Sequence, residues 1–200
     1  MQYIHSHNFV HRDLKPSNII MGVGRHANIV HLIDFGLSKE FWDPNTYLHI
    51  PLKEGLGLVG TADFASINSY LCSELGRQDD LESLAYILLY FMWGFLPWQG
   101  LGQQDILKSK QGITTLNLFH KLPLEFHMLF EHSHSLSFEG KPNYNHFCHL
   151  FDNLLVKEQL QSDVAFDWDV AGAEISGRDF KITGDFPLHD CSPSYKHCLR

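Results

Sequence analysis

Residues suited to phosphoryl chemistry cluster near the start of the 200-residue chain. His11 to Asn18 read HRDLKPSN, which fits the pattern HRDxxxxN at every fixed position. Phosphoryl transfer asks a protein for a carboxylate that orients the attacking hydroxyl and accepts its proton, and for ligands that hold magnesium against the phosphates. Asp13 is a candidate for the carboxylate and Asn18 for a magnesium ligand. Lys15 can reach the transferring phosphate and offset the charge that develops there.

A second string, Asp34, Phe35 and Gly36, follows an apolar run sixteen residues after Asn18. A lone DFG occurs by chance in many proteins, but HRDxxxxN followed at short range by a strand and DFG is typical of the catalytic loop and magnesium motif of protein kinases. The two strings together predict that Asn18 and Asp34 are magnesium ligands. They also predict ATP and Mg²⁺ as cofactors.

A competing motif is present at Gly22, Gly24 and Ala27, which satisfy GxGxxG/A, the dinucleotide-binding fingerprint. That fingerprint needs a strand before it and a helix after it, because the helix N-terminus holds the pyrophosphate. The next segment, Ile29 to Ile33, is itself a β-branched strand candidate. We therefore interpret these glycines as part of a hairpin turn.

A small β element and several helices are expected to position the motifs. The apolar runs Asn18 to Met21 and Ile29 to Ile33 flank a Gly-bearing segment, which predicts two short strands joined by a turn. Apolar residues then recur at helical spacing, and a loop punctuated by Pro and Gly covers Leu96 to Gly100. The predicted fold class is mainly α, with a short β-hairpin near the start. The apolar stripes expected to be buried are Leu81, Leu84, Ala85, Leu88 and Phe91, and Phe147, Leu150, Phe151, Leu154 and Leu155, with a further helix over Leu124 to His134.

Composition and charge exclude several classes of partner. The formal net charge is -8 and no basic run is present, which argues against nucleic-acid or anionic-membrane binding. The opening MQYIHSHNFV lacks a signal-peptide pattern, so a cytoplasmic or nuclear location is expected. The four cysteines are scattered and are expected to be reduced thiols. His127, Glu131 and His134 share one helix face, but no further ligand completes a zinc site, and we interpret them as a solvated face.

The segment Gly60 to Asn68 reads GTADFASIN, where most protein kinases carry an APE motif. It is similar to GTARYASIN, the signature of the casein kinase 1 family of Ser/Thr kinases. The chain resembles this family over about residues 3 to 168. Further strings that carry the resemblance are IHSHNFVHRDLKPSN, MGVGRHAN, HLIDFGLSK, HIP, DDLESL, LPWQG and FDW.

The resemblance implies a kinase C-terminal lobe over residues 1–170, acting on protein Ser and Thr hydroxyls with ATP. It leaves the oligomeric state open. From about Gly172 the sequence loses its periodicity and collects Gly, Pro, Asp and Ser, so a divergent, poorly ordered tail is expected over 171–200. By position, Asp13 resembles the catalytic base, Lys15 the phosphate-contacting Lys, and Asn18 with Asp34 the magnesium ligands. Thr61 would hydrogen-bond near Asp13 and Lys15, and Asp80 would brace the catalytic loop from the central helix. Ile20 and Ile33 would form the floor of the adenine pocket.

Three departures from the family pattern bear on function. Asp63 stands where the family usually has Arg, and residues 39–48 replace a stretch rich in Arg and Lys. We therefore hypothesise that the preference for acidic or prephosphorylated substrates is weakened or lost.

The third departure concerns the Gly-rich loop and the Lys–Glu pair of a kinase. These parts lie upstream of HRD, and only ten residues precede His11 here. The expectation is a truncated form in which the N-terminal lobe is missing. The alternatives are a catalytically inactive, kinase-like interaction module or a gene remnant, although Asp13, Asn18 and Asp34 are all retained.

Overall fold

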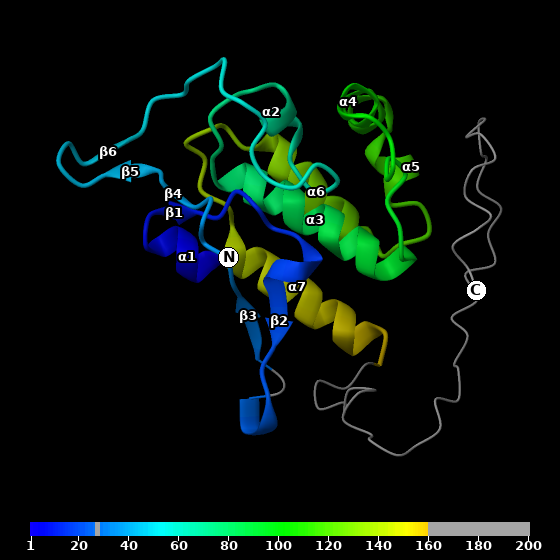
Figure 1. The fold of residues 1–200 in the computed structure, drawn as a ribbon. Coiled ribbons are helices and arrows are strands. Elements are labelled where there is room, and N and C mark those ends of the chain that lie inside the picture. The colour runs from blue at the N-terminus through cyan, green and yellow to red at the C-terminus, as the bar shows by residue number, and fades with distance from the viewer. Residues whose placement is uncertain (27–28, 160–200) are drawn as a thin grey trace. The chain divides into compact units, whose positions relative to one another are not determined.

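Short antiparallel strands occupy the first part of the chain and helices the remainder (Figure 1). The computed structural model describes residues 1–26 and 29–159. Helix α1 (Gln2–Ser6) precedes β1 (Phe9–Val10), which pairs with β4 (Lys39–Glu40). Strand β2 (Ile19–Met21) pairs with β3 (Val30–Leu32), and β5 (Trp42–Asp43) pairs with β6 (Leu48–His49). Two short 3₁₀ helices, η1 (Pro16–Asn18) and η2 (Gly24–His26), flank β2.

The β2–β3 hairpin is the β element that the sequence predicts near the start. Its register pairs Ile20 with His31 at the centre. Beyond the last paired residues, Ile33 N donates a hydrogen bond to Asn18 O at 3.0 Å. This bond brings the end of HRDxxxxN next to the residue that precedes DFG, so the hairpin joins the two motifs.

The helical part contains α2 (Ile67–Tyr70), α3 (Arg77–Trp93), α4 (Gln103–Gly112), α5 (Thr115–Leu118), α6 (Leu124–Ser135) and α7 (Tyr144–Lys157). Helix α3 packs against α6 and α2, while α6 also contacts α5 and α7. Figure 1 shows α3 and α6 side by side among the other helices. The predicted helices and the short hairpin are confirmed, but the structure also has two further antiparallel strand pairs, β1–β4 and β5–β6, that were not predicted. The predicted helix over Leu124 to His134 is also confirmed, since α6 ends one residue later.

The burial of α3 differs from the single apolar stripe that its spacing predicts. Leu81 and Ala85 are buried as expected, but Phe91 is 56% exposed, which corrects that prediction. Tyr86 and Ile87, which lie outside the stripe, are fully buried. The reason is that α3 is surrounded by other segments over its first turns and emerges toward solvent only near its C-terminal end.

The stripe of α7 is buried in part. Phe147 and Leu154 are buried, whereas Leu155 is 40% exposed. The prediction that Leu155 belongs to the buried stripe is therefore wrong. Leu96 to Gly100 form a loop without helix or strand, as predicted, and two of its side chains, Leu96 and Trp98, enter the core. No helix in the part of the chain that the structure describes could cross a membrane. The predicted boundary at 170 and the tail at 171–200 lie outside the described residues.

Candidate active site

Asp13 lies in the loop between β1 and η1, and its carboxylate is contacted from both sides. Thr61 Oγ1 donates to Asp13 Oδ1 at 2.7 Å, and Lys15 Nζ donates to Asp13 Oδ2 at 2.8 Å. The Asn18 amide donates to Asp13 O at 2.9 Å, which closes the loop on itself. Four of the residues singled out in the sequence, Asp13, Lys15, Asn18 and Thr61, therefore meet at one place.

Asp80, near the start of α3, holds the backbone of the catalytic loop. Its Oδ2 accepts a hydrogen bond from His11 N at 2.7 Å, and its Oδ1 accepts one from Arg12 N at 2.9 Å. Arg12 has a φ of 67°, a conformation that costs energy in a residue with a side chain. Asp80 is 1% exposed, so its charge is stabilised chiefly by these donors. The buried carboxylate thus offsets the strain at the residue before Asp13.

His5 is a third partner of Asp80 that the motifs do not reveal. His5 Nε2 lies 2.8 Å from Asp80 Oδ2, and His5 Nδ1 lies 2.6 Å from the Tyr144 hydroxyl. Both residues lie far from Asp80 along the chain, on α1 and at the start of α7. Burial is the main cause that raises the pKa of Tyr144, so its hydroxyl stays protonated and can donate to the imidazole. The hydrogen bonds around Asp80 therefore link α1, α3 and α7.

Gly60, which precedes Thr61, approaches the catalytic loop closely. Its φ is 92°, and a Cβ at this position would lie 2.6 Å from Arg12 O. Only glycine combines this conformation with this approach. The glycine therefore allows Thr61 to reach Asp13.

The residues expected to contact the nucleotide lie at the β2–β3 hairpin. Ile20 is 43% exposed and Ile33 is 38% exposed, so both present apolar surface to solvent. Asp34 is exposed, with a φ of 62°, and its Oδ1 accepts a hydrogen bond from Gly36 N at 3.3 Å. The hydrogen bond from Ile33 N to Asn18 O places the Asp34 backbone next to Asn18. Both side chains offer oxygen, the donor atom that magnesium prefers.

Lys110 is a site residue that sequence reasoning missed. It comes from α4, is 4% exposed, and donates from Nζ to Ala65 O at 2.5 Å and to Ala62 O at 3.4 Å. The ammonium also lies over the rings of Tyr86 and Trp98, 4.5 and 4.9 Å from their centroids. Burial lowers the pKa of Lys110 to about 7 against the opposing charges of nearby carboxylates. Lys110 fixes the turn that follows Thr61.

Two buried glutamates are further residues without a signal in the motifs. Glu82 Oε1 accepts hydrogen bonds from Ile67 N at 2.9 Å and from the Tyr86 hydroxyl at 2.7 Å, which ties α2 to α3. Glu74 is 2% exposed and accepts a hydrogen bond from Lys39 Nζ at 2.6 Å. Arg12 Nη1 lies 3.8 Å from the other oxygen of Glu74. Glu82 and Tyr86 are four residues apart on α3, but the other partners lie far apart in the sequence, so helical periodicity does not reveal them.

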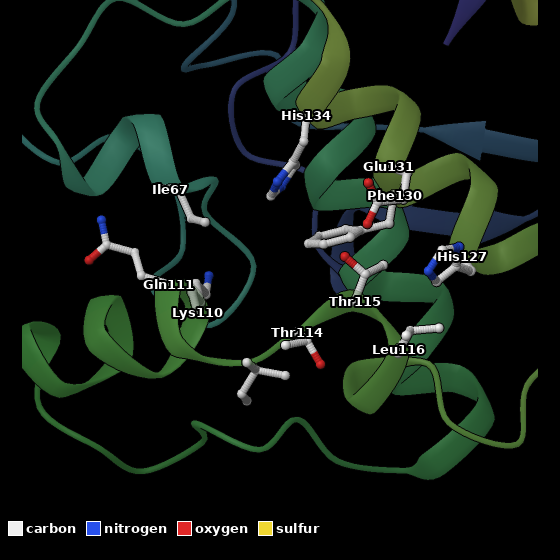
Figure 2. A pocket seen from close by; sticks show the side chains of 11 residues that line it. Ile67, Lys110, Gln111, Thr114, Thr115, Leu116, His127, Phe130, Glu131 and His134 are labelled. Carbon is white, nitrogen blue, oxygen red and sulfur yellow. The ribbon is translucent and has the colours of Figure 1, made fainter.

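A cavity of about 620 Å³ between α2, α4, α5 and α6 is lined by Lys110, but not by the site residues that the sequence predicts (Figure 2). Figure 2 shows Thr115, Phe130 and His134 pointing toward the space between the helices. Asp13, Lys15, Asn18, Ile20, Ile33, Asp34 and Thr61 are not among its lining residues. His127 and Glu131 line it too, but within residues 1–26 and 29–159 no three His, Cys, Asp or Glu side chains could hold a metal ion.

Comparison with known families agrees with this geometry. The family model described as the protein kinase domain matches residues 1–161. Since the match covers most of the 200 residues, the chain belongs to the protein kinase domain family. This family transfers phosphate and generally uses ATP and Mg²⁺.

Proposed function

We propose that the chain is the C-terminal lobe of a Ser/Thr protein kinase of casein kinase 1 type, transferring the γ-phosphate of ATP to protein Ser and Thr hydroxyls. The observation that carries the proposal is the carboxylate of Asp13, held between Thr61 Oγ1 at 2.7 Å and Lys15 Nζ at 2.8 Å. The Ser/Thr and casein kinase 1 assignments rest on Lys15 in the catalytic loop and on the GTADFASIN segment.

Asp13 acts as the base in this proposal. Each oxygen of a carboxylate can accept more than one hydrogen bond, so Asp13 keeps acceptor capacity beyond the donors of Thr61 and Lys15. An incoming hydroxyl would donate to one of these oxygens, be oriented by it, and pass its proton to it during the transfer. Lys15 carries a positive charge next to the reacting oxygen, where negative charge develops. Thr61 limits rotation of the carboxylate, so the orientation exists before the substrate arrives.

Asn18 and Asp34 would hold magnesium, and the ion when bound would neutralise charge on the phosphates. The donor set fits this role, because a side-chain amide and a carboxylate both offer hard oxygen atoms. Ile20 and Ile33 offer apolar surface of the kind that suits a purine ring.

We further propose that residues outside 1–200 close the nucleotide site from the opposite side. Ile20, Ile33 and Phe35 are 43%, 38% and 49% exposed at adjoining positions of the two motifs, and such apolar side chains are normally covered in a working site. Without that cover, the phosphates would not be held in line with the hydroxyl. We therefore expect residues 1–200 alone to transfer phosphate slowly.

The test is incorporation of phosphate from labelled ATP into a mixed Ser/Thr substrate, with a Tyr polymer as the comparison substrate. Asp13→Asn should lower the rate about 1,000-fold, because general-base catalysis contributes on that scale. Asp152→Asn, at an exposed position on α7, makes the same change of charge and should have no effect. Equal rates for the wild type and Asp13→Asn would contradict the proposal and favour the inactive interaction module.

A further inference from the structure

The turn that carries Thr61 also carries an acidic side chain, Asp63. The two residues are separated by one position, so their Cα atoms are at most about 7.6 Å apart. Thr61 Oγ1 is itself 2.7 Å from Asp13 Oδ1. Asp63 therefore lies two positions from the residue that contacts the proposed base.

Hydrogen bonds to backbone oxygens hold this turn in one conformation. Phe64 N and Ala65 N both donate to Thr61 O, at 2.9 and 2.8 Å. Trp98 Nε1 donates to Asp63 O at 2.8 Å, and Trp98 is fully buried. The backbone of Asp63 is thus attached to the core, and its carboxylate is presented from a rigid support, which lowers the entropy cost of contacting a ligand.

The carboxylate of Asp63 is partly exposed and has no hydrogen bond or ion pair with the residues that the structure describes. The charged and titratable groups that face it are Lys110 and Tyr70. Lys110 directs its ammonium to Ala62 O and Ala65 O beneath the turn. Burial, followed by the charge of Asp63, raises the pKa of Tyr70 to about 12, so this phenol stays neutral.

Three cations that adjoin the catalytic loop already have anionic partners. Lys15 pairs with Asp13 at 2.8 Å, and Lys39 pairs with the buried Glu74 at 2.6 Å. Arg12 lies 3.8 Å from the same glutamate. Asp63, by contrast, offers a negative side chain to a flanking residue of a substrate.

We infer that Asp63 selects protein substrates with Lys or Arg close to the acceptor hydroxyl, and disfavours substrates with Asp or Glu there. The inference rests on the proposed function, because it assumes that the hydroxyl is placed at Asp13. An extended peptide advances about 3.3 Å per residue, so a residue within three positions of the acceptor reaches up to about 10 Å from it. The selected residue is therefore expected within about three positions of the acceptor Ser or Thr.

The test uses labelled peptides that bind to the full 200-residue chain, read by fluorescence anisotropy, so that binding is measured without phosphate transfer. One set carries Lys, Ala or Glu at each position from three before to three after a central Ser. We expect Lys to bind about fivefold more tightly than Ala at one of these positions, and Glu more weakly, with both differences shrinking at high salt. Asp63→Asn should remove the preference, and Asp63→Arg should invert it. Asp152→Asn should leave it unchanged.

Three outcomes would overturn the inference: no peptide binds, the binding does not depend on charge, or the preference for Lys persists in Asp63→Asn. The same peptides are then used as substrates for phosphate transfer. Transfer without a charge preference would contradict the inference and leave the proposed function intact. Binding with the Lys preference but no transfer would contradict the proposed function alone.

Discussion

The loop around Asp13 and the β2–β3 hairpin differ in how firmly the rest of the domain holds them. The catalytic loop is attached to α3 through the buried Asp80, and Asp13 is contacted by Thr61 and Lys15. The hairpin carries the exposed Ile20, and Asp34 follows it in an exposed loop, where its side chain accepts one long hydrogen bond from Gly36 N. The half of the site that would activate a hydroxyl is therefore preorganised, while the half that would hold the nucleotide is open.

The largest effect is expected from Asp80→Ala. This change leaves His11 N and Arg12 N without their buried acceptor, so the free energy of unfolding should fall by about 4 kcal/mol, measured by urea denaturation. Asp34→Ala removes a carboxylate from the exposed loop after the hairpin and should change stability by less than about 0.5 kcal/mol. Similar losses for the two variants would show that the two regions are held equally.

A somewhat smaller effect is expected from Gly60→Ala. The new Cβ would lie 2.6 Å from Arg12 O at a φ of 92°, so strain and a backbone clash should together cost about 3 kcal/mol. Gly55→Ala is the matched control, because its φ is 76° but nothing lies within 4 Å of the added carbon. Its cost should be about 1 kcal/mol, from strain alone. Equal costs in thermal or urea unfolding would argue against a close approach of Gly60 to the catalytic loop.

The pH dependence of stability tests the burial of Lys110 in the preorganised region. Its folded pKa of about 7 lies below the ordinary value of 10.5, so between these values the unfolded chain binds more protons than the folded chain. Stability should therefore rise as pH increases from 7 toward 9, by roughly 2 kcal/mol from this group. Lys110→Met should lose this rise, and Lys108→Met, at an exposed position on the same helix, should keep it. An unchanged pH profile in Lys110→Met would contradict the assignment.

The smallest change in stability is expected from Ile20→Ala in the hairpin. Because Ile20 is 43% exposed, truncation should cost less than about 1 kcal/mol, whereas Ile87→Ala in the core of α3 should cost about 3 kcal/mol. Ile20→Ala should nevertheless weaken nucleotide binding several-fold, since the lost surface is the proposed adenine floor. If Ile20→Ala binds a fluorescent ATP analogue as tightly as the wild type does, Ile20 does not contact the nucleotide.

Much of this architecture could be predicted from local signals. The hairpin, α6 and the loop after α3 follow from β-branched runs, helical spacing and Pro and Gly punctuation. The spacing of HRDxxxxN and DFG allowed Asp13, Lys15, Asn18 and Asp34 to be proposed as site residues. The burial of α3 could not be predicted in this way, because a helix surrounded by neighbours buries polar and apolar positions alike, and its Phe91 is exposed.

The sequence by itself determined which groups are available for chemistry and the order in which they occur. The tertiary structure alone decided which distant groups support them: His5 and Tyr144 behind Asp80, Glu74 beside Arg12, and Lys110 beneath the turn of Thr61. The physical reason is that a motif reflects neighbours along the chain, whereas a buried charge is stabilised by partners that packing brings from far away. The same packing left Asp63 partly exposed beside the proposed base, without a partner among the described residues.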